Sequence, residues 1–217
     1  MATPAGAAMT EGTARGTVIA AAVLTACALV GAALVALTHR DTAPAIAANR
    51  ESAVRERLTA VLPPGPFDRS PAQAPLQVRA PAALGSRDAL PVYRAVRDGK
   101  VIAVVFTAVA PDGYGGAIRL LAGVQRDGGI TGVRVIAHQE TPGLGDAIEA
   151  DRSDWIRQFH GRRLGAPPAE AWRVAADGGA FDAITGATIT SRAVTGAVRR
   201  ALVYFRAHRE RLLTTDG

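Results

Sequence analysis

Cysteine is almost absent from this sequence of 217 residues, since Cys27 is the only one, and it lies inside an uncharged N-terminal stretch. The rest of the chain therefore has no disulfide, no thiolate nucleophile and no cysteine ligand for zinc or an iron–sulfur cluster. The lack of disulfides does not by itself identify the compartment.

Lysine is equally scarce, because Lys100 is the only one, although the net charge is +6 and the isoelectric point is near 10.6. The positive charge comes from arginines that stand singly or in pairs among alanines. Binding to a phosphate backbone needs clustered basic residues, and no basic stripe interleaved with aromatics is present. The composition thus argues against a nucleic-acid partner.

Charged residues are absent from residues 17–38, a run of 22. As a helix this run would be roughly 33 Å long, which is enough for one bilayer crossing. We predict a transmembrane helix here, with residues 1–16 in the cytoplasm. A cleaved signal peptide is one alternative, but its apolar region usually has about 7–15 residues. A lipoprotein box from Leu24 to Cys27 is another, and the apolar run continues beyond it.

The charges around this segment leave its orientation open. Arg15 is the only basic residue close to its N-terminal side, whereas four follow it: Arg40, Arg50, Arg55 and Arg57. Counted simply, the positive-inside rule would keep the following domain in the cytoplasm, but long domains translocate largely regardless of charge.

Residues 39–90 are predicted to form a juxtamembrane helix and a linker. Apolar residues recur at helical spacing between residues 53 and 62, and Pro63 and Pro64 end this pattern. From Pro63 to about Leu90 the chain is rich in Pro and Ala and shows little periodicity, which is typical of a linker or a surface loop.

A folded domain is predicted from residue 91 to residue 217. Four β-prone runs cover residues 92–96, 101–109, 117–124 and 130–137. Asp-Gly pairs at 98–99 and 127–128 separate the members of each pair of runs and favour hairpins. The pattern predicts an antiparallel meander with one apolar face.

Helical spacing replaces this alternation further along the chain. Ile148, Trp155, Ile156 and Phe159 predict an amphipathic helix over residues 147–159, and an apolar stripe predicts a final helix over about residues 191–212. A short strand is expected at residues 172–175. The fold class is therefore α+β, with helices packed on one antiparallel sheet.

The segment just before the final helix is the richest in chemistry. Residues 182–191 contain four hydroxyl side chains and one glycine. Thr190 or Ser191 is expected to cap the helix. A helix N-terminus also favours a phosphate, and Gly186 with Ala187 would let a bulky ligand approach the backbone. The residues alone leave a simple cap and a phosphate site as alternatives.

The run from Asp182 to Thr188 resembles the flavinylation motif Asp-x-x-Ser/Thr-Gly-Ala-Thr. That motif belongs to the FMN-binding domain family shared by the G subunit of the Rnf/Rsx electron transport complex and the C subunit of the sodium-pumping NADH:quinone reductase. The resemblance implies that Thr188 carries FMN through a phosphoester, installed by a flavin transferase from FAD, and that Asp182 belongs to the signal read by that transferase. From its residue type alone, Asp182 would cap or hydrogen-bond the turn. The other expected cofactor-site residues here are Thr185, Gly186, Ala187, Thr190 and Ser191.

A second loop carries the run Glu-Thr-Pro-Gly-Leu-Gly at residues 140–145. By itself it is an ordinary turn, and it lacks the third glycine of a dinucleotide fingerprint. Members of the same family carry this run at the same distance before the flavinylated threonine, which implies that the loop lies along the isoalloxazine ring. The implied site residues are Glu140, Thr141, Gly143, Leu144 and Gly145, with Tyr114 from a Gly-rich stretch that otherwise reads as a turn.

No metal site and no catalytic residue are predicted. His138 and Glu140 are two residues apart and would share one face of an extended segment, but no third ligand is near. Thr188 is expected to act as an attachment point, neither acid nor base.

The resemblance implies an electron carrier within a multi-protein complex of the bacterial inner membrane, with its flavin domain in the periplasm. Its partners would be the other subunits of a complex that couples electron flow between ferredoxin and NAD to ion movement. The quinone reductase member of the family typically carries a longer soluble insertion, so this short chain fits the Rnf/Rsx member better. The rivals are the quinone reductase member itself, a regulatory membrane protein with the same flavin domain, and a tethered scaffold domain without flavin.

Overall fold

The computed structural model describes residues 21, 22, 24–29, 31, 32 and 54–214. The chain divides into two compact units, residues 1–51 and 52–217. The described residues of the first unit are helical and exposed. Within the described part of the chain, no helix has the length and apolar character needed to cross a membrane. Most of the predicted span at residues 17–38, and all of residues 1–16, lie outside that part.

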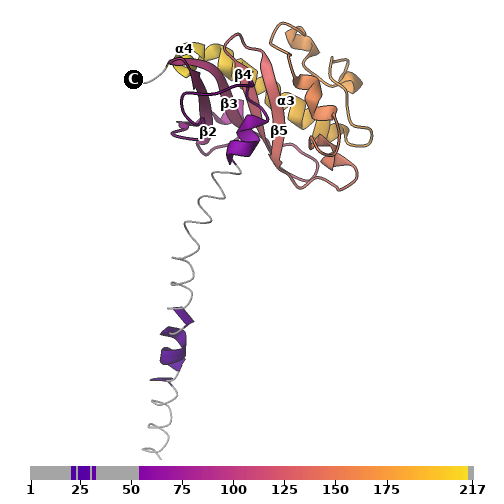
Figure 1. Ribbon diagram of the computed structural model, residues 1–217. Coiled ribbons are helices and arrows are strands. Elements are labelled where there is room, and N and C mark those ends of the chain that lie inside the picture. Colours follow the sequence, from indigo (N-terminus) through magenta and orange to yellow (C-terminus); the bar gives the residue numbers. More distant parts are fainter. Residues whose placement is uncertain (1–20, 23, 30, 33–53, 215–217) are drawn as a thin grey trace, which may run out of the picture. The chain divides into compact units, whose positions relative to one another are not determined.

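The second unit is built on a five-stranded antiparallel sheet whose strands lie side by side in chain order (Figure 1). The four strands expected from the alternating pattern are present. Asp98 and Gly99 have φ values of 52° and 69°, the positive values that a tight hairpin turn requires. The strands are β1 (Leu76–Val78), β2 (Leu90–Arg97), β3 (Lys100–Ala110), β4 (Ile118–Gln125) and β5 (Ile130–Ala137).

The segment before β2 adds a strand, a short helix and core residues to the fold, although the composition of residues 63–90 suggests only a linker or a surface loop. Residues 54–59 form the helix expected before Pro63. β1 pairs with β2, and the short helix α2 (Pro81–Leu84) begins with a proline and ends at Gly85 with φ 73°. Val78 and Leu84 are buried in the main core.

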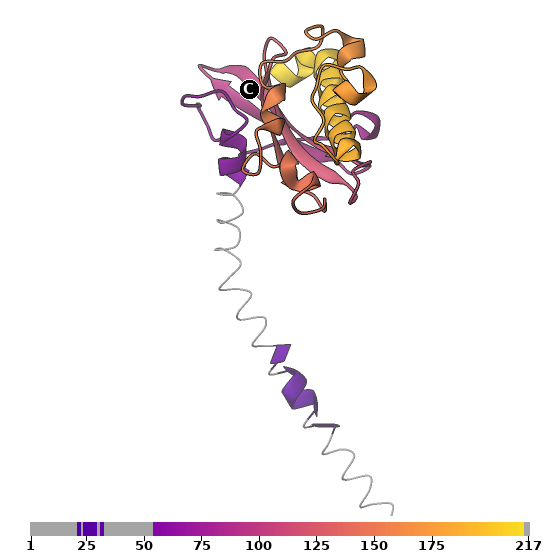
Figure 2. The same ribbon diagram turned by 90° about the vertical axis from the view of Figure 1, so that its right-hand side faces the viewer.

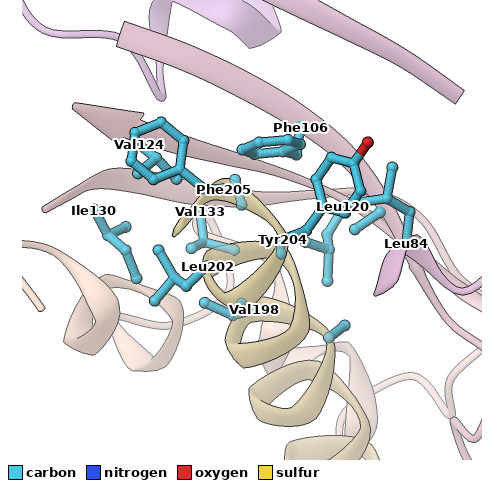
Figure 3. Packing of buried hydrophobic residues seen from close by; sticks show 14 of the residues in the cluster. Leu84, Phe106, Leu120, Val124, Ile130, Val133, Val198, Leu202, Tyr204 and Phe205 are labelled. Atoms are coloured by element: carbon cyan, nitrogen blue, oxygen red, sulfur yellow. The ribbon is translucent and has the colours of Figure 1, made fainter. Parts of the chain in front are cut away.

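One face of the sheet is covered by α3 (Thr188–Ala207), which α4 (Arg209–Leu213) follows (Figures 1 and 2). Figure 3 shows Tyr204 and Phe205 directed toward the strands, where both rings meet Phe106 edge to face at 6.1 and 6.4 Å between centroids. Pairs of this geometry contribute about 0.5–1.5 kcal/mol beyond area burial. The C-terminal half of α3 is thus fixed against the middle of the sheet.

The opposite face is covered by residues 54–72, which form a second, smaller core. Leu58, Val61 and Leu62 pack there against side chains from β2, β3 and β4. A Cβ at Gly123 would lie 2.0 Å from the carbonyl oxygen of Val61, so glycine is needed for this close approach. Since both faces are covered, β3 is a nearly continuous buried run.

The predicted helix at residues 147–159 is wrong. Two short 3₁₀ helices replace it: η1 (Gly145–Ile148) and η2 (Trp155–Phe159). Between them, the Ser153 hydroxyl donates to the Ala147 carbonyl at 2.6 Å and accepts from the Trp155 amide at 3.1 Å. Such side-chain bonds compete with a regular helix. The apolar spacing nevertheless identified core residues, because Ile148, Ile156 and Phe159 are fully buried.

Two other boundaries also differ from prediction. The strand expected at residues 172–175 is reduced to a single bridge between Val174 and Phe181, and a short 3₁₀ turn, η4 (Ala175–Asp177), follows. Another turn, η3 (Ala169–Ala171), precedes it. The final helix begins three residues earlier than expected, at Thr188, and is interrupted at His208.

Candidate functional site

Three segments meet at one end of the sheet. The β3–β4 loop (residues 111–117) and the β5–η1 loop (residues 138–144) leave neighbouring strand ends, as the pairing of Ala110 with Ile118 and of Arg119 with Ala137 requires. A Cβ at Gly115 would lie 1.9 Å from the Gln139 carbonyl oxygen, so the two loops touch backbone to backbone. The N-terminal end of α3 is the third segment.

These segments enclose a cavity of about 460 Å³, within the range of about 300–1,000 Å³ usual for small-molecule sites. Of the twelve predicted cofactor-site residues, three do not line it: Thr185, Gly143 and Ser191. Sequence reasoning missed one lining residue, Ile189, and the only signal in the sequence was a large apolar residue directly after Thr188. The lining residues are Tyr114, Glu140, Thr141, Leu144, Gly145, Gly186, Ala187, Thr188, Ile189 and Thr190.

The N-terminus of α3 has no side-chain cap from any residue that the structure describes. Its first hydrogen bond runs from the Ser191 amide to the Ala187 carbonyl at 3.0 Å, so the amides of residues 188–190 have no acceptor within the helix. The predicted cap at Thr190 or Ser191 is wrong, because the helix has already begun when these residues are reached. Free amides and the positive end of the helix dipole together suit a phosphate.

Thr188 is the first residue of α3 and lines the cavity. It is half-buried, and its hydroxyl forms no hydrogen bond with the described part of the chain. A hydroxyl at this position can therefore take a new bond without breaking an existing contact.

Ser191 supports the site from behind. It is fully buried, and its hydroxyl donates to the Ala187 carbonyl and accepts from the Ile184 amide, both at 3.0 Å. These bonds hold the turn that the Ala187 amide closes on the Ile184 carbonyl at 2.9 Å. Gly186, with φ 81°, occupies the position where such a turn needs a residue without a side chain.

The β5–η1 loop is compact because one carbonyl anchors it. The Thr141 oxygen accepts from the amides of Leu144, Gly145 and Asp146 at 3.2, 3.0 and 3.4 Å. The Leu144 side chain leans over Gly186, where a Cβ would lie 2.8 Å from Leu144 Cδ1. The loop therefore contacts the turn before α3 directly.

Large apolar side chains stand exposed around the cavity. The exposed fractions are 70% for Tyr114, 42% for Leu144 and 49% for Ile189. Apolar side chains around a few polar groups are the usual lining of a cofactor site. A flat aromatic ring system could bury this surface.

Glu140 lies under the cavity with both carboxylate oxygens occupied. Oε2 accepts from the Thr190 hydroxyl at 2.6 Å, and Oε1 accepts from the Gly115 amide at 3.1 Å. The β3–β4 loop, the β5–η1 loop and the first turn of α3 are joined through this one side chain.

His138 does not act together with Glu140 as a pair of metal ligands. Its Nδ1 accepts from the Glu140 amide at 3.0 Å, which leaves the ring proton on Nε2, 2.8 Å from Glu149 Oε1. Within the described ranges, no group of three His, Cys, Asp or Glu residues is arranged to hold a metal ion.

Asp182 is held by its backbone rather than by its carboxylate. Its amide donates to Gln158 Oε1 at 2.7 Å, and its carbonyl accepts from Trp155 Nε1 at 2.7 Å. The side chain is exposed, as is that of Thr185. Asp182 was expected to cap the turn, but its carboxylate forms no hydrogen bond with the described residues.

Comparison with known proteins adds to this geometry. A family model for the FMN-binding domain matches residues 113–203, a range that contains every residue lining the cavity. A second model, for the RnfG N-terminal region, matches residues 9–61.

Curated relatives match most of the chain. The G subunit of the ion-translocating oxidoreductase complex of Pseudomonas aeruginosa is 48% identical over 87% of this chain and 88% of its own length. The proteins of the same name from Aliivibrio fischeri and Vibrio vulnificus are each 42% identical, over 88% and 87% of this chain and 91% and 88% of their own lengths.

Proposed function

Because the chain belongs to the RnfG family of ion-translocating oxidoreductase complex subunits, we propose that it carries FMN on Thr188 through a phosphoester. Family membership and the FMN-binding domain make the chain a flavin-binding member of that complex, together with other subunits. The covalent bond, its position and the topology are the proposed parts.

One observation carries the proposal: a hydroxyl without a partner among the described residues stands at an uncapped helix N-terminus inside a cavity of about 460 Å³. A phosphate bonded to Thr188 would lie beside the free amides of residues 188–190 and the positive end of α3. The exposed apolar groups of Tyr114, Leu144 and Ile189 would then contact the ring system.

Attachment requires a separate enzyme, a flavin transferase that uses FAD. The Thr188 oxygen forms a bond to the phosphorus of the FMN half, the bond from that phosphorus to AMP breaks, and AMP leaves while the hydroxyl proton passes to solvent. No electrons are exchanged in this step. The exposed Asp182 carboxylate is available for recognition by the transferase.

Once bound, the flavin supplies the electron transfer, and the chain supplies position and surroundings. A covalent bond prevents the cofactor from diffusing away, which suits a carrier that exchanges electrons with neighbouring subunits. The chain then needs no small-molecule substrate of its own.

We place the protein in the bacterial inner membrane, crossing it once through residues 17–38, with the flavin domain in the periplasm. The match of residues 9–61 to the RnfG N-terminal region supports an arrangement common to the family. A phosphatase reporter fused after Gly217 should be active only in the periplasm. If a cytoplasmic reporter at the same position is active instead, the flavin domain lies in the cytoplasm and the proposed orientation is wrong.

The attachment is tested by expressing the full chain with and without a flavin transferase and viewing the denaturing gel under ultraviolet light. Denaturation strips a noncovalent flavin, so a fluorescent band reports a covalent one. The Thr188→Val variant should lose the band. Thr214→Val is the control and should keep the band, because Thr214 is exposed and lies outside both the Asp182–Thr188 motif and the cavity; a band that survives Thr188→Val rejects the proposal.

A further inference from the structure

Glu140 is the only charged side chain in the described part of the chain that is buried, with 5% of its surface exposed. An ionised carboxylate in such a place is unfavourable unless its oxygens are hydrogen-bonded or paired with a cation. The position therefore calls for a physical reason beyond packing.

Hydrogen bonds, not cations, satisfy this carboxylate. Both oxygens act as acceptors, from the Thr190 hydroxyl and from the Gly115 amide, which is the pattern of the ionised form. The 2.6 Å bond from Thr190 lies in the range of charge-assisted O–H···O⁻ bonds. No Arg, Lys or His of the described residues forms an ion pair with Glu140. A negative charge without a neutralising cation from those residues thus lies beside the cavity.

Two glycines, which have no side chain, leave room for the Glu140 carboxylate. A Cβ at Gly113 would lie 2.7 Å from Glu140 Oε1, and a Cβ at Gly145 would lie 2.8 Å from Oε2. Gly113 lies in the β3–β4 loop, and Gly145 is the first residue of η1, directly after the β5–η1 loop. The carboxylate therefore occupies a space that two loops and the first turn of α3 create together.

We propose that Glu140 is a positioning residue that joins the three segments around the cavity, and that its fixed charge lowers the reduction potential of the flavin held there. This rests on the proposed function, since only a chain that holds FMN has such a potential. Reduction adds negative charge to the flavin. A fixed negative charge in surroundings of low dielectric opposes that addition more strongly than one in water would.

Two substitutions separate the charge from the contacts. Glu140→Gln removes the charge but keeps the length: its oxygen can accept from the Gly115 amide and its amide group can donate to the Thr190 oxygen. Glu140→Asp keeps the charge but is one methylene shorter, so it cannot keep both contacts. Glu149→Gln is the matched control for a nearby carboxylate, because the Glu149 side chain is 36% exposed and solvent screens its charge.

The experiment uses the full chain loaded with FMN by a flavin transferase, and measures the potential by stepwise reduction with dithionite against a reference dye. Glu140→Gln should shift the potential to more positive values. Glu140→Asp should stay close to wild type while its melting temperature falls, and Glu149→Gln should shift the potential less than Glu140→Gln.

An unchanged potential in Glu140→Gln overturns the inference, and so does an equal shift in the Gln and Asp variants, which would make geometry the cause. If Glu140→Gln does not fold, the Asp variant decides: a wild-type potential despite the lost contacts supports the charge, and a positive shift rejects it. If the wild-type chain takes up no FMN from the flavin transferase, the proposed function is rejected instead. The failure of the proposed function and the failure of this inference are therefore distinguishable.

Discussion

The cavity has two unlike walls. The helix wall, residues 184–191, has polar groups without a hydrogen-bond partner among the described residues: the Thr188 hydroxyl and the amides of residues 188–190. The loop wall, residues 138–145, uses its polar groups internally, since the Thr141 carbonyl accepts three amides and Glu140 accepts with both oxygens. The helix wall is thus equipped to bond a ligand, and the loop wall is equipped to shape the ligand's surroundings.

The four hydroxyl residues of the helix wall also differ from one another in burial and hydrogen bonding. Thr190 and Ser191 are buried and hydrogen-bonded, and Thr185 is exposed outside the cavity. Thr188 lies inside the cavity, and its hydroxyl has no hydrogen-bond partner in the part of the chain that the structure describes. Four similar side chains within seven residues thus have different roles, and their positions in the turn and helix decide which.

The largest effect is expected when the free hydroxyl is moved. The double change Thr188→Ala with Ile189→Thr keeps a threonine in the first turn but rotates it by about 100° around the helix. We expect complete loss of covalent FMN, measured as flavin fluorescence of the denatured chain. Retained fluorescence would mean that any hydroxyl near the helix start suffices, and the contrast between hydroxyls would be lost.

Crowding the loop wall should have the next largest effect. In Gly145→Ala the new methyl group would lie 2.8 Å from Glu140, and overpacking of this kind costs about 1–3 kcal/mol. We expect an unfolding free energy lower by about 2 kcal/mol in chemical denaturation of the full chain in detergent. Gly196→Ala is the control: within α3 it meets only the tip of Arg200, and it should stabilise the chain by up to about 1 kcal/mol.

Removing the support behind the helix wall comes third. Ser191→Ala leaves the Ile184 amide without its acceptor, and an unsatisfied buried donor costs about 1–3 kcal/mol. We expect a loss near 1 kcal/mol, because this amide is only partly buried, and slower attachment of FMN. Thr185→Ala, an exposed change in the same turn, should stay within about 0.5 kcal/mol of wild type. Equal effects of the two changes would show that Ser191 does not hold the turn.

Sequence reasoning succeeded where short-range patterns decide the structure. Alternation and Asp-Gly turns predicted four strands of the sheet, because a hairpin is specified by its own residues. It failed for β1, since three residues among prolines and alanines carry no period, and for the helix at 147–159, which the Ser153 side chain interrupts. Apolar spacing finds core residues more reliably than it finds the backbone that carries them.

The same limit applies to the site. The loop sequences drew attention to most of the lining residues. The cap was misplaced because nothing local indicates that α3 begins at Thr188 and leaves three amides free. The contact between Glu140 and Thr190 joins residues 50 positions apart and depends on the tertiary fold.

A smaller effect is expected from the apolar part of the loop wall. Leu144→Ala should change the unfolding free energy by roughly 0.5 kcal/mol or less, because the side chain is 42% exposed. If Leu144 contacts the ring, iodide should quench the attached flavin more efficiently in this variant. Val203→Ala is the matched control, since Val203 is also 42% exposed but does not line the cavity. Equal quenching in both variants would remove Leu144 from the flavin site.

The smallest effect concerns the exposed ion pair beside α3. Arg192 donates two hydrogen bonds to Asp177, and these hold the pKa of Asp177 below its ordinary value. The pair's stabilisation is therefore complete above the unfolded pKa, about 3.9, and is lost as the pH falls through the lower folded pKa. Asp177→Asn should lower the melting temperature slightly at pH 7 and not at all in strong acid. A difference that grows on acidification would contradict this sign.

Whether the Thr188 hydroxyl alone carries the flavin is tested most directly by tandem mass spectrometry of the tryptic peptide that ends at Arg192, from protein made in its native host. We expect FMN as a phosphoester on Thr188 and unmodified Thr185, Thr190 and Ser191. An unmodified peptide, or FMN on any other residue, would contradict the assignment.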